Sequence, residues 1–214
     1  MATVHSTSTS QSAARHARGR QAYLPLAVWA FLLAPLAVLL HELGHWVAGR
    51  IMGYEVLLEV GSVSGGAKLG AAPGGDVALQ AGAGPAVSVA LTLLALAFIR
   101  RGSVAPWALA LAAAAPVRFL VVVVALVVDL VVAVLGGTRG IPNFDEYNLA
   151  AGLAVPAYPL FLAVVIFMLW TWWFVWKRLP GRRWLSLLSL VVGAGVGLAL
   201  WFQIIGPPVV GLFR

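Results

Sequence analysis

The sequence predicts an all-α polytopic membrane protein, with about five or six transmembrane helices and a small membrane-surface β-hairpin between the first two. The first observation is composition: 62% of the 214 residues are hydrophobic, 10% are charged and the mean hydropathy is +0.97, which excludes an ordinary soluble domain. The second is a series of apolar runs, each long enough to cross about 30 Å of hydrocarbon. The third is a glycine-rich, β-prone segment, residues 54–81, that separates the first two runs.

Cysteine content and charge narrow the possible partners. The chain has no cysteine, so any zinc that it binds must use histidine and carboxylate ligands. The net charge of +7 would suggest nucleic acid in a soluble protein. Here the cations lie in short loops beside apolar runs, where they set membrane topology. We therefore expect the lipid bilayer, and no nucleic acid, as a partner.

We expect three parts: a disordered basic tail over residues 1–22, a membrane core over residues 23–156, and two additional transmembrane helices over residues 157–214. The tail is rich in Ser and Thr, has no acidic residue and carries three arginines, Arg15, Arg18 and Arg20. A transit peptide has the same composition and is the alternative. A cleaved signal peptide is not expected, because the apolar run that follows is too long.

The first predicted helix, residues 23–50, contains the motif around which the chain is organised. His41 and His45 are four residues apart, so on a helix both imidazoles face one point, at a spacing that zinc accepts. Glu42 follows the first histidine and is placed to act as a general base toward a metal-bound water. The alternative is a pair of interfacial histidines with a snorkelling glutamate. At bilayer depth such groups are costly unless they are paired or bind metal.

The segment 54–81 is predicted to form a β-hairpin or small sheet next to this motif. Residues 54–60 are β-prone, residues 77–80 are the candidate partner strand, and glycines lie between them. A plain flexible loop is the alternative. If a hairpin forms, its exposed edge is able to pair with an extended substrate.

The next two predicted helices cover residues 82–99 and 104–135. The second of these blocks is too long for one straight crossing, and Pro106 and Pro116 interrupt it. We expect a short helix or re-entrant segment followed by a crossing over residues 117–135.

Two acidic residues are candidates for a third metal ligand. Asp129 lies inside the third block, about three turns from Arg118, which is too far for a direct pair, and Arg118 is expected to snorkel to an interface. Asp145 lies in a polar loop, residues 136–156, where Asp145 and Glu146 also suit the first turn of a short helix.

The last two predicted helices cover residues 158–176 and 184–205, and the loop between them is basic. With the N-terminus in the cytoplasm, nine Lys and Arg side chains lie inside and four outside, which obeys the positive-inside rule. The inside set is Arg15, Arg18, Arg20, Arg100, Arg101, Lys177, Arg178, Arg182 and Arg183, and the outside set is Arg50, Lys68, Arg139 and Arg214. The composition favours a bacterium, and so its plasma membrane.

These motifs together resemble a known family. The run His41-Glu42-Leu43-Gly44-His45 on a first core helix precedes a strand-rich segment, then Ala83-Gly84-Pro85 opening a helix, then a later aspartate. The pattern is similar to the site-2 protease family of intramembrane zinc metalloproteases, in its small bacterial branch without a PDZ domain. The resemblance covers about residues 25–155.

The resemblance implies a role for each matching residue. His41 and His45 match the zinc ligands, Glu42 the catalytic glutamate, and Asp145 the third ligand, with Asp129 as the alternative. Ser88 stands near the position of an asparagine that lines the substrate channel, and Glu146 stands where a glycine commonly follows the aspartate. The implied activity is hydrolysis of a peptide bond in or beside a transmembrane segment of a membrane protein. The competing hypothesis is a catalytically inactive zinc-binding scaffold or regulator.

Overall fold

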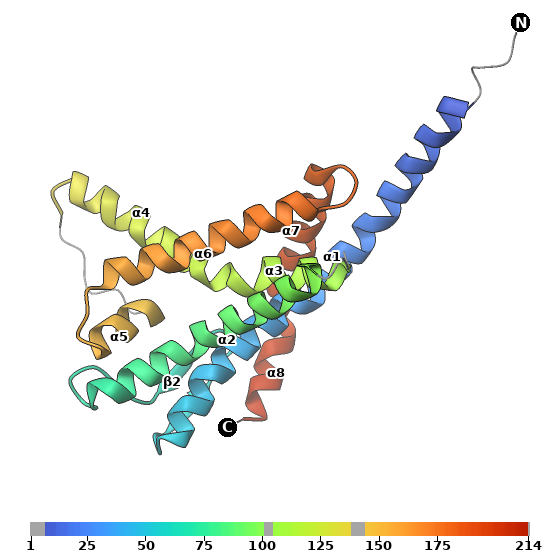
Figure 1. Ribbon diagram of the computed structural model, residues 1–214. Helices are drawn as coiled ribbons and strands as arrows, with labels where there is room; N and C mark the ends of the chain where they lie inside the picture. Colours follow the sequence, from blue (N-terminus) through green and yellow to red (C-terminus); the bar gives the residue numbers. More distant parts are fainter. Residues whose placement is uncertain (1–6, 101–104, 138–143, 214) are drawn as a thin grey trace, which may run out of the picture.

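The computed structural model describes residues 7–100, 105–137 and 144–213, with side chains described from residue 23 onward except at position 100 (Figure 1). Five helical segments are long and apolar enough to cross a membrane: Tyr23–Ile51, Gly74–Ile99, Pro106–Val134, Ala157–Arg178 and Arg183–Gly211. A two-stranded antiparallel sheet lies between the first two helices. The predicted all-α polytopic class with a small hairpin is therefore confirmed.

Helix α1, Thr7–Ile51, is longer than the predicted first span. It begins within the segment that we expected to be a disordered tail, and its N-terminal part projects beyond the other helices (Figure 1). The Ala, Gln and Arg residues of that segment have good helix propensity, which accounts for the difference. The helix ends before Gly53, whose φ of +83° is the left-handed conformation that commonly follows a helix C-terminus.

The hairpin forms with its first strand inside the predicted segment 54–60, but with a different partner strand. Strand β1, Val56–Leu58, pairs with β2, Val63–Gly65, in the register Leu57↔Ser64. The expected partner strand at residues 77–80 is wrong, because those residues belong to helix α2, Gly74–Arg100. A short apolar run is compatible with either a strand or a helix, and here Pro73 and Asp76 begin a helix.

The third apolar block is helical throughout and changes geometry in the middle. It consists of α3, Pro106–Ala114, a 3₁₀ turn, η1, Ala115–Phe119, and α4, Leu120–Val134. Pro116 lies in the 3₁₀ turn, since proline has no N–H to donate to an α-helical ladder. The predicted interruption at this proline is thus a tightened turn within one continuous span.

The remaining elements are α5, Asp145–Gly152, α6, Ala157–Arg178, α7, Arg183–Leu200, a π-helical turn, η2, Trp201–Ile205, and α8, Gly206–Gly211. Helix α1 packs against α2, α3 and α7. At Gly193 and Gly197 of α7 an added Cβ would overlap the α1 backbone, so these glycines permit the close helix packing expected in a bilayer.

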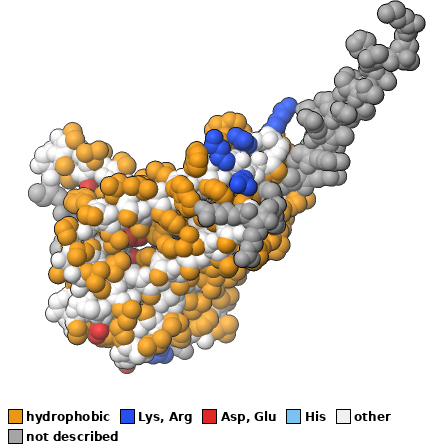
Figure 2. Space-filling view, in the orientation of Figure 1, with side chains coloured by type: hydrophobic (Ala, Val, Ile, Leu, Met, Phe, Trp, Pro, Cys, Tyr) orange, Lys and Arg blue, Asp and Glu red, His pale blue; other side chains and the backbone are white. Residues whose placement is uncertain are grey.

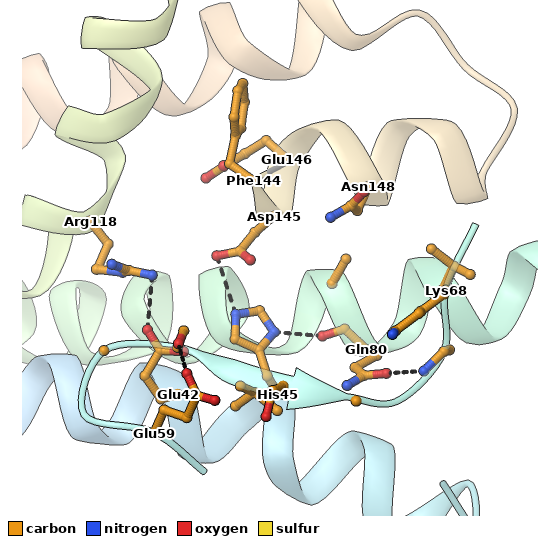
Figure 3. A pocket seen from close by; sticks show the side chains of 18 of the residues that line it. Glu42, His45, Glu59, Lys68, Gln80, Arg118, Phe144, Asp145, Glu146 and Asn148 are labelled. Carbon is orange, nitrogen blue, oxygen red and sulfur yellow. Dashed lines mark hydrogen bonds and ion pairs between the residues drawn. The ribbon is translucent and has the colours of Figure 1, made fainter. Parts of the chain in front are cut away.

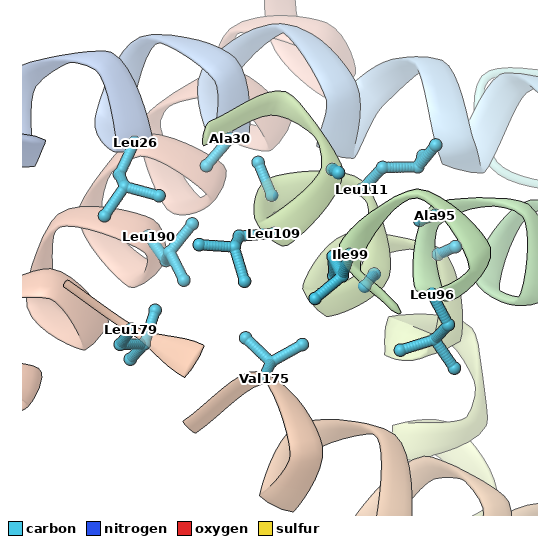
Figure 4. Close-up of a cluster of buried hydrophobic side chains, with 14 residues drawn as sticks. Leu26, Ala30, Ala95, Leu96, Ile99, Leu109, Leu111, Val175, Leu179 and Leu190 are labelled. Atoms are coloured by element: carbon cyan, nitrogen blue, oxygen red, sulfur yellow. The ribbon is translucent and has the colours of Figure 1, made fainter. Parts of the chain in front are cut away.

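A buried apolar cluster joins α1, α2, α3, α6 and α7 away from the histidines (Figure 4). Leu26, Leu109 and Leu190 are at its centre. Outside it, the surface is largely apolar, with Lys and Arg side chains gathered near the α6–α7 connection (Figure 2). Such a surface suits contact with lipid. Part of the topology prediction rests on side chains outside the described residues, namely Arg15, Arg18, Arg20, Arg100, Arg101, Arg139 and Arg214.

Candidate metal centre

Three potential ligand atoms from α1 and α5 converge at one point. Asp145 Oδ2 lies 2.9 Å from His41 Nε2 and 3.2 Å from His45 Nε2, and the two Nε2 atoms are 3.2 Å apart. Ligands of a tetrahedral zinc ion at about 2.0–2.1 Å are themselves about 3.3 Å apart. The three atoms therefore already have nearly the mutual separations that such an ion requires.

Each histidine is oriented by a contact on its other ring nitrogen. His45 Nδ1 lies 2.7 Å from the backbone carbonyl of Gln80 and donates to it, because a carbonyl oxygen only accepts. That bond leaves Nε2 of His45 as the nitrogen that is available to a metal ion. His41 Nδ1 lies 2.9 Å from Ser88 Oγ, a buried hydroxyl that fixes the second ring in the same way.

Two glycines allow α1 and α2 to approach closely enough for these bonds. An added Cβ at Gly44 would lie 2.8 Å from the Ala83 carbonyl oxygen, and one at Gly84 would overlap the ring of His45. Both positions therefore need a residue without a side chain. The close approach of α2 then places Gln80 and Ser88 against the histidines.

Asp145 is the first residue of α5, after Phe144 in an extended conformation. Burial opposes the ionisation of Asp145, but its hydrogen bonds with His41 and His45 outweigh this effect and hold its pKa well below the usual range. A lowered pKa favours the ionised form of Asp145, which is the form that binds a metal ion. Burial, with the neighbouring charge of Asp145, raises the pKa of Glu146 to about 7. Among the described residues, the group of converging ligand atoms includes Asp145 and not Asp129.

Glu42 contacts Arg118, which we predicted to reach a membrane interface. Arg118 Nη2 lies 2.9 Å from Glu42 Oε1, and the Glu42 side chain is only 2% exposed. The expectation that Arg118 snorkels to an interface is wrong, because the 3₁₀ turn η1 directs it toward α1. The contact is a charge pair without an aligned hydrogen bond: among the described groups, Oε1 is a buried oxygen without a hydrogen-bonding partner.

These groups line a pocket of about 820 Å³ between the hairpin and α5 (Figure 3). Arg118 and Glu42 lie on one side of it, Asp145 stands opposite His45, and Lys68 lies at the far side (Figure 3). Strand β2 contributes Ser64 to the wall. The predicted hairpin and the polar loop therefore do meet at the histidines.

Three contributors to this site were not recognised as such from the sequence. Arg118 was assigned to an interface, Ser88 to a substrate channel, and Gln80 to a strand. Ser88 lies one turn beyond Gly84 on the same helix, a spacing that offers a signal for its contact with His41. The role of Gln80 belongs to its backbone carbonyl, which no residue pattern reveals.

Comparison of the chain with protein-family models, with curated proteins and with solved structures finds no match.

Proposed function

We propose that this protein is an intramembrane zinc metalloendopeptidase that hydrolyses a peptide bond in or beside a transmembrane segment of another membrane protein. The observation that carries the proposal is the convergence of His41 Nε2, His45 Nε2 and Asp145 Oδ2 beside a pocket that His45, Asp145 and the buried Glu42 line. Two imidazoles and a carboxylate are the ligand set of many catalytic zinc sites, in which the fourth position is left to water or substrate.

Zinc bound at these three atoms would supply a Lewis acid that polarises a peptide carbonyl and lowers the pKa of a water molecule to about 7. Glu42 is the group that holds the proton during the reaction. Its carboxylate accepts a proton from the attacking water and later gives it to the amine that leaves. An ionised carboxylate has several lone-pair sites, so Glu42 is able to accept a proton while its Oε1 contacts Arg118.

The surroundings of the pocket support a substrate class. Backbone at bilayer depth is normally held in a helix, so a transmembrane substrate must unwind locally before hydrolysis. Strand β2 lines the pocket and belongs to a two-stranded sheet, so a substrate in extended conformation has a strand beside the histidines with which to pair.

The cellular setting is part of the proposal. The distribution of Lys and Arg along the sequence supports a cytoplasmic N-terminus, and composition supports a bacterial plasma membrane. The five apolar helices fit a multi-pass protein in that membrane.

A second candidate function is a zinc-binding membrane scaffold that does not cleave. The contact between Glu42 and Arg118 favours it, because a glutamate that is held by a permanent ion pair is a weaker proton acceptor. The two candidates differ in turnover and not in metal content.

The test combines metal analysis with cleavage. Wild-type protein, Glu42→Gln and His41→Ala are purified into liposomes with a set of single-span reporters, each carrying a folded domain on either side. We expect wild type and Glu42→Gln to retain zinc, and wild type alone to cleave. Cleavage by Glu42→Gln at the wild-type rate would contradict the assigned base, and zinc binding without cleavage of any reporter would favour the scaffold.

A further inference from the structure

Arg118 is a charged group at this pocket that the proposed mechanism does not use. It lies in the 3₁₀ turn between α3 and α4, in a span whose other charged residue is Asp129, and a cation there is costly unless it has a partner or reaches water. Its side chain is 29% exposed and lines the same pocket as His45 and Asp145. The guanidinium therefore faces the pocket.

Glu42 needs a counter-charge, and Arg118 supplies it. The Glu42 carboxylate is almost fully buried, and an isolated buried carboxylate is strongly unfavourable. The carboxylates of Asp145 and Glu146 line the same pocket and add negative charge. Arg118 Nη2, at 2.9 Å, is the cationic group in contact with Glu42 among the described residues.

We propose that Arg118 is a positioning residue that holds the Glu42 carboxylate at the pocket wall, beside the metal-binding histidines. The contact at 2.9 Å restrains the carboxylate, which keeps further lone-pair sites to accept a proton from a ligand. This inference rests on the proposed function for its catalytic meaning, but the pairing itself does not require a substrate.

The first test uses acetohydroxamate binding to the zinc-loaded protein. A hydroxamate chelates zinc and carries a proton that a neighbouring carboxylate can hold, so its affinity depends on where Glu42 is placed. We expect Glu42→Gln and Arg118→Met each to weaken binding about tenfold, the value of one charge-assisted hydrogen bond. The double variant should be no weaker than either single variant, because both remove the same interaction.

Two further variants separate positioning from a general effect of charge. Arg118→Lys should recover part of the affinity, since lysine keeps the charge but not the planar shape of the guanidinium. Lys68→Met removes a cation from the same pocket and should bind acetohydroxamate as wild type does. Zinc content should be equal in all of these proteins.

A melting comparison covers the case in which Arg118→Met is unstable. Loss of Arg118 alone leaves a buried carboxylate without its counter-charge, so Arg118→Met should melt lower than wild type, and the double variant should recover part of the loss. Wild-type hydroxamate affinity in Arg118→Met, or no recovery in the double variant, would overturn the inference. Absence of zinc from the wild type would contradict the proposed function alone, because the melting comparison needs no metal.

Discussion

Removal of the Ser88 hydroxyl should weaken metal binding without touching a metal ligand. Ser88 Oγ lies 2.9 Å from His41 Nδ1, and the Ser88 residue is 1% exposed. In Ser88→Ala the buried ring nitrogen loses its partner, and water has little access to replace it. A buried unsatisfied group costs about 1–3 kcal/mol, which corresponds to a loss of zinc affinity of about 5- to 150-fold and brackets the roughly 10- to 100-fold effect that removing such a supporting bond usually has.

The assay is a competitive zinc titration against a chromophoric chelator, with Thr92→Val as the matched control. Thr92 lies one turn further along α2, is fully buried, and donates its hydroxyl to the backbone oxygen of Ser88 and not to a histidine. Both variants therefore remove one buried hydroxyl from the same helix. Equal zinc affinity in Ser88→Ala and Thr92→Val would refute the argument that Ser88 orients His41.

Three other predictions follow from the same geometry. Asp145→Asn should lose most of its zinc while Asp129→Asn keeps it, as measured by metal analysis of the purified proteins; the reverse pattern would make Asp129 the ligand. Gly84→Ala should also lose zinc, because the added methyl group overlaps the ring of His45. The control is Gly195→Ala, which should bind zinc normally because an added Cβ there meets no atom within 4 Å. Equal zinc content in the two variants would contradict the close approach of the helices. Zinc at about 100 times its dissociation constant should stabilise the fold by about 2.7 kcal/mol and so raise the melting temperature by several degrees. A melting curve that a chelator does not shift would show that the native protein has no metal site.

The fold class and half of the site could be predicted from the sequence, for clear physical reasons. Apolar runs of bilayer length have few alternatives to transmembrane helices, and the five candidate spans follow them. The spacing of His41 and His45 fixes their common face once the segment is helical. Local pattern was sufficient for both inferences.

Contacts that depend on tertiary packing were harder to predict from the sequence. Asp145 meets the histidines only because α5 packs on α2, a contact that links residues far apart in the chain. The direction of Arg118 depends on the 3₁₀ turn at Pro116, and the partner of β1 depends on where α2 begins. In each case the sequence indicates the chemistry of the side chain, but elements distant in the chain determine which residues it contacts.

The central claim is that His41, His45 and Asp145 hold one zinc ion. X-ray absorption at the zinc edge of the purified protein tests it most directly. We predict one zinc per chain, with two imidazole nitrogens at about 2.0–2.1 Å and carboxylate oxygen at about 2.0–2.2 Å, and loss of this signal in Asp145→Asn. A protein that binds no zinc, or a zinc environment that is unchanged when Asp145 or either histidine is replaced, would contradict the account.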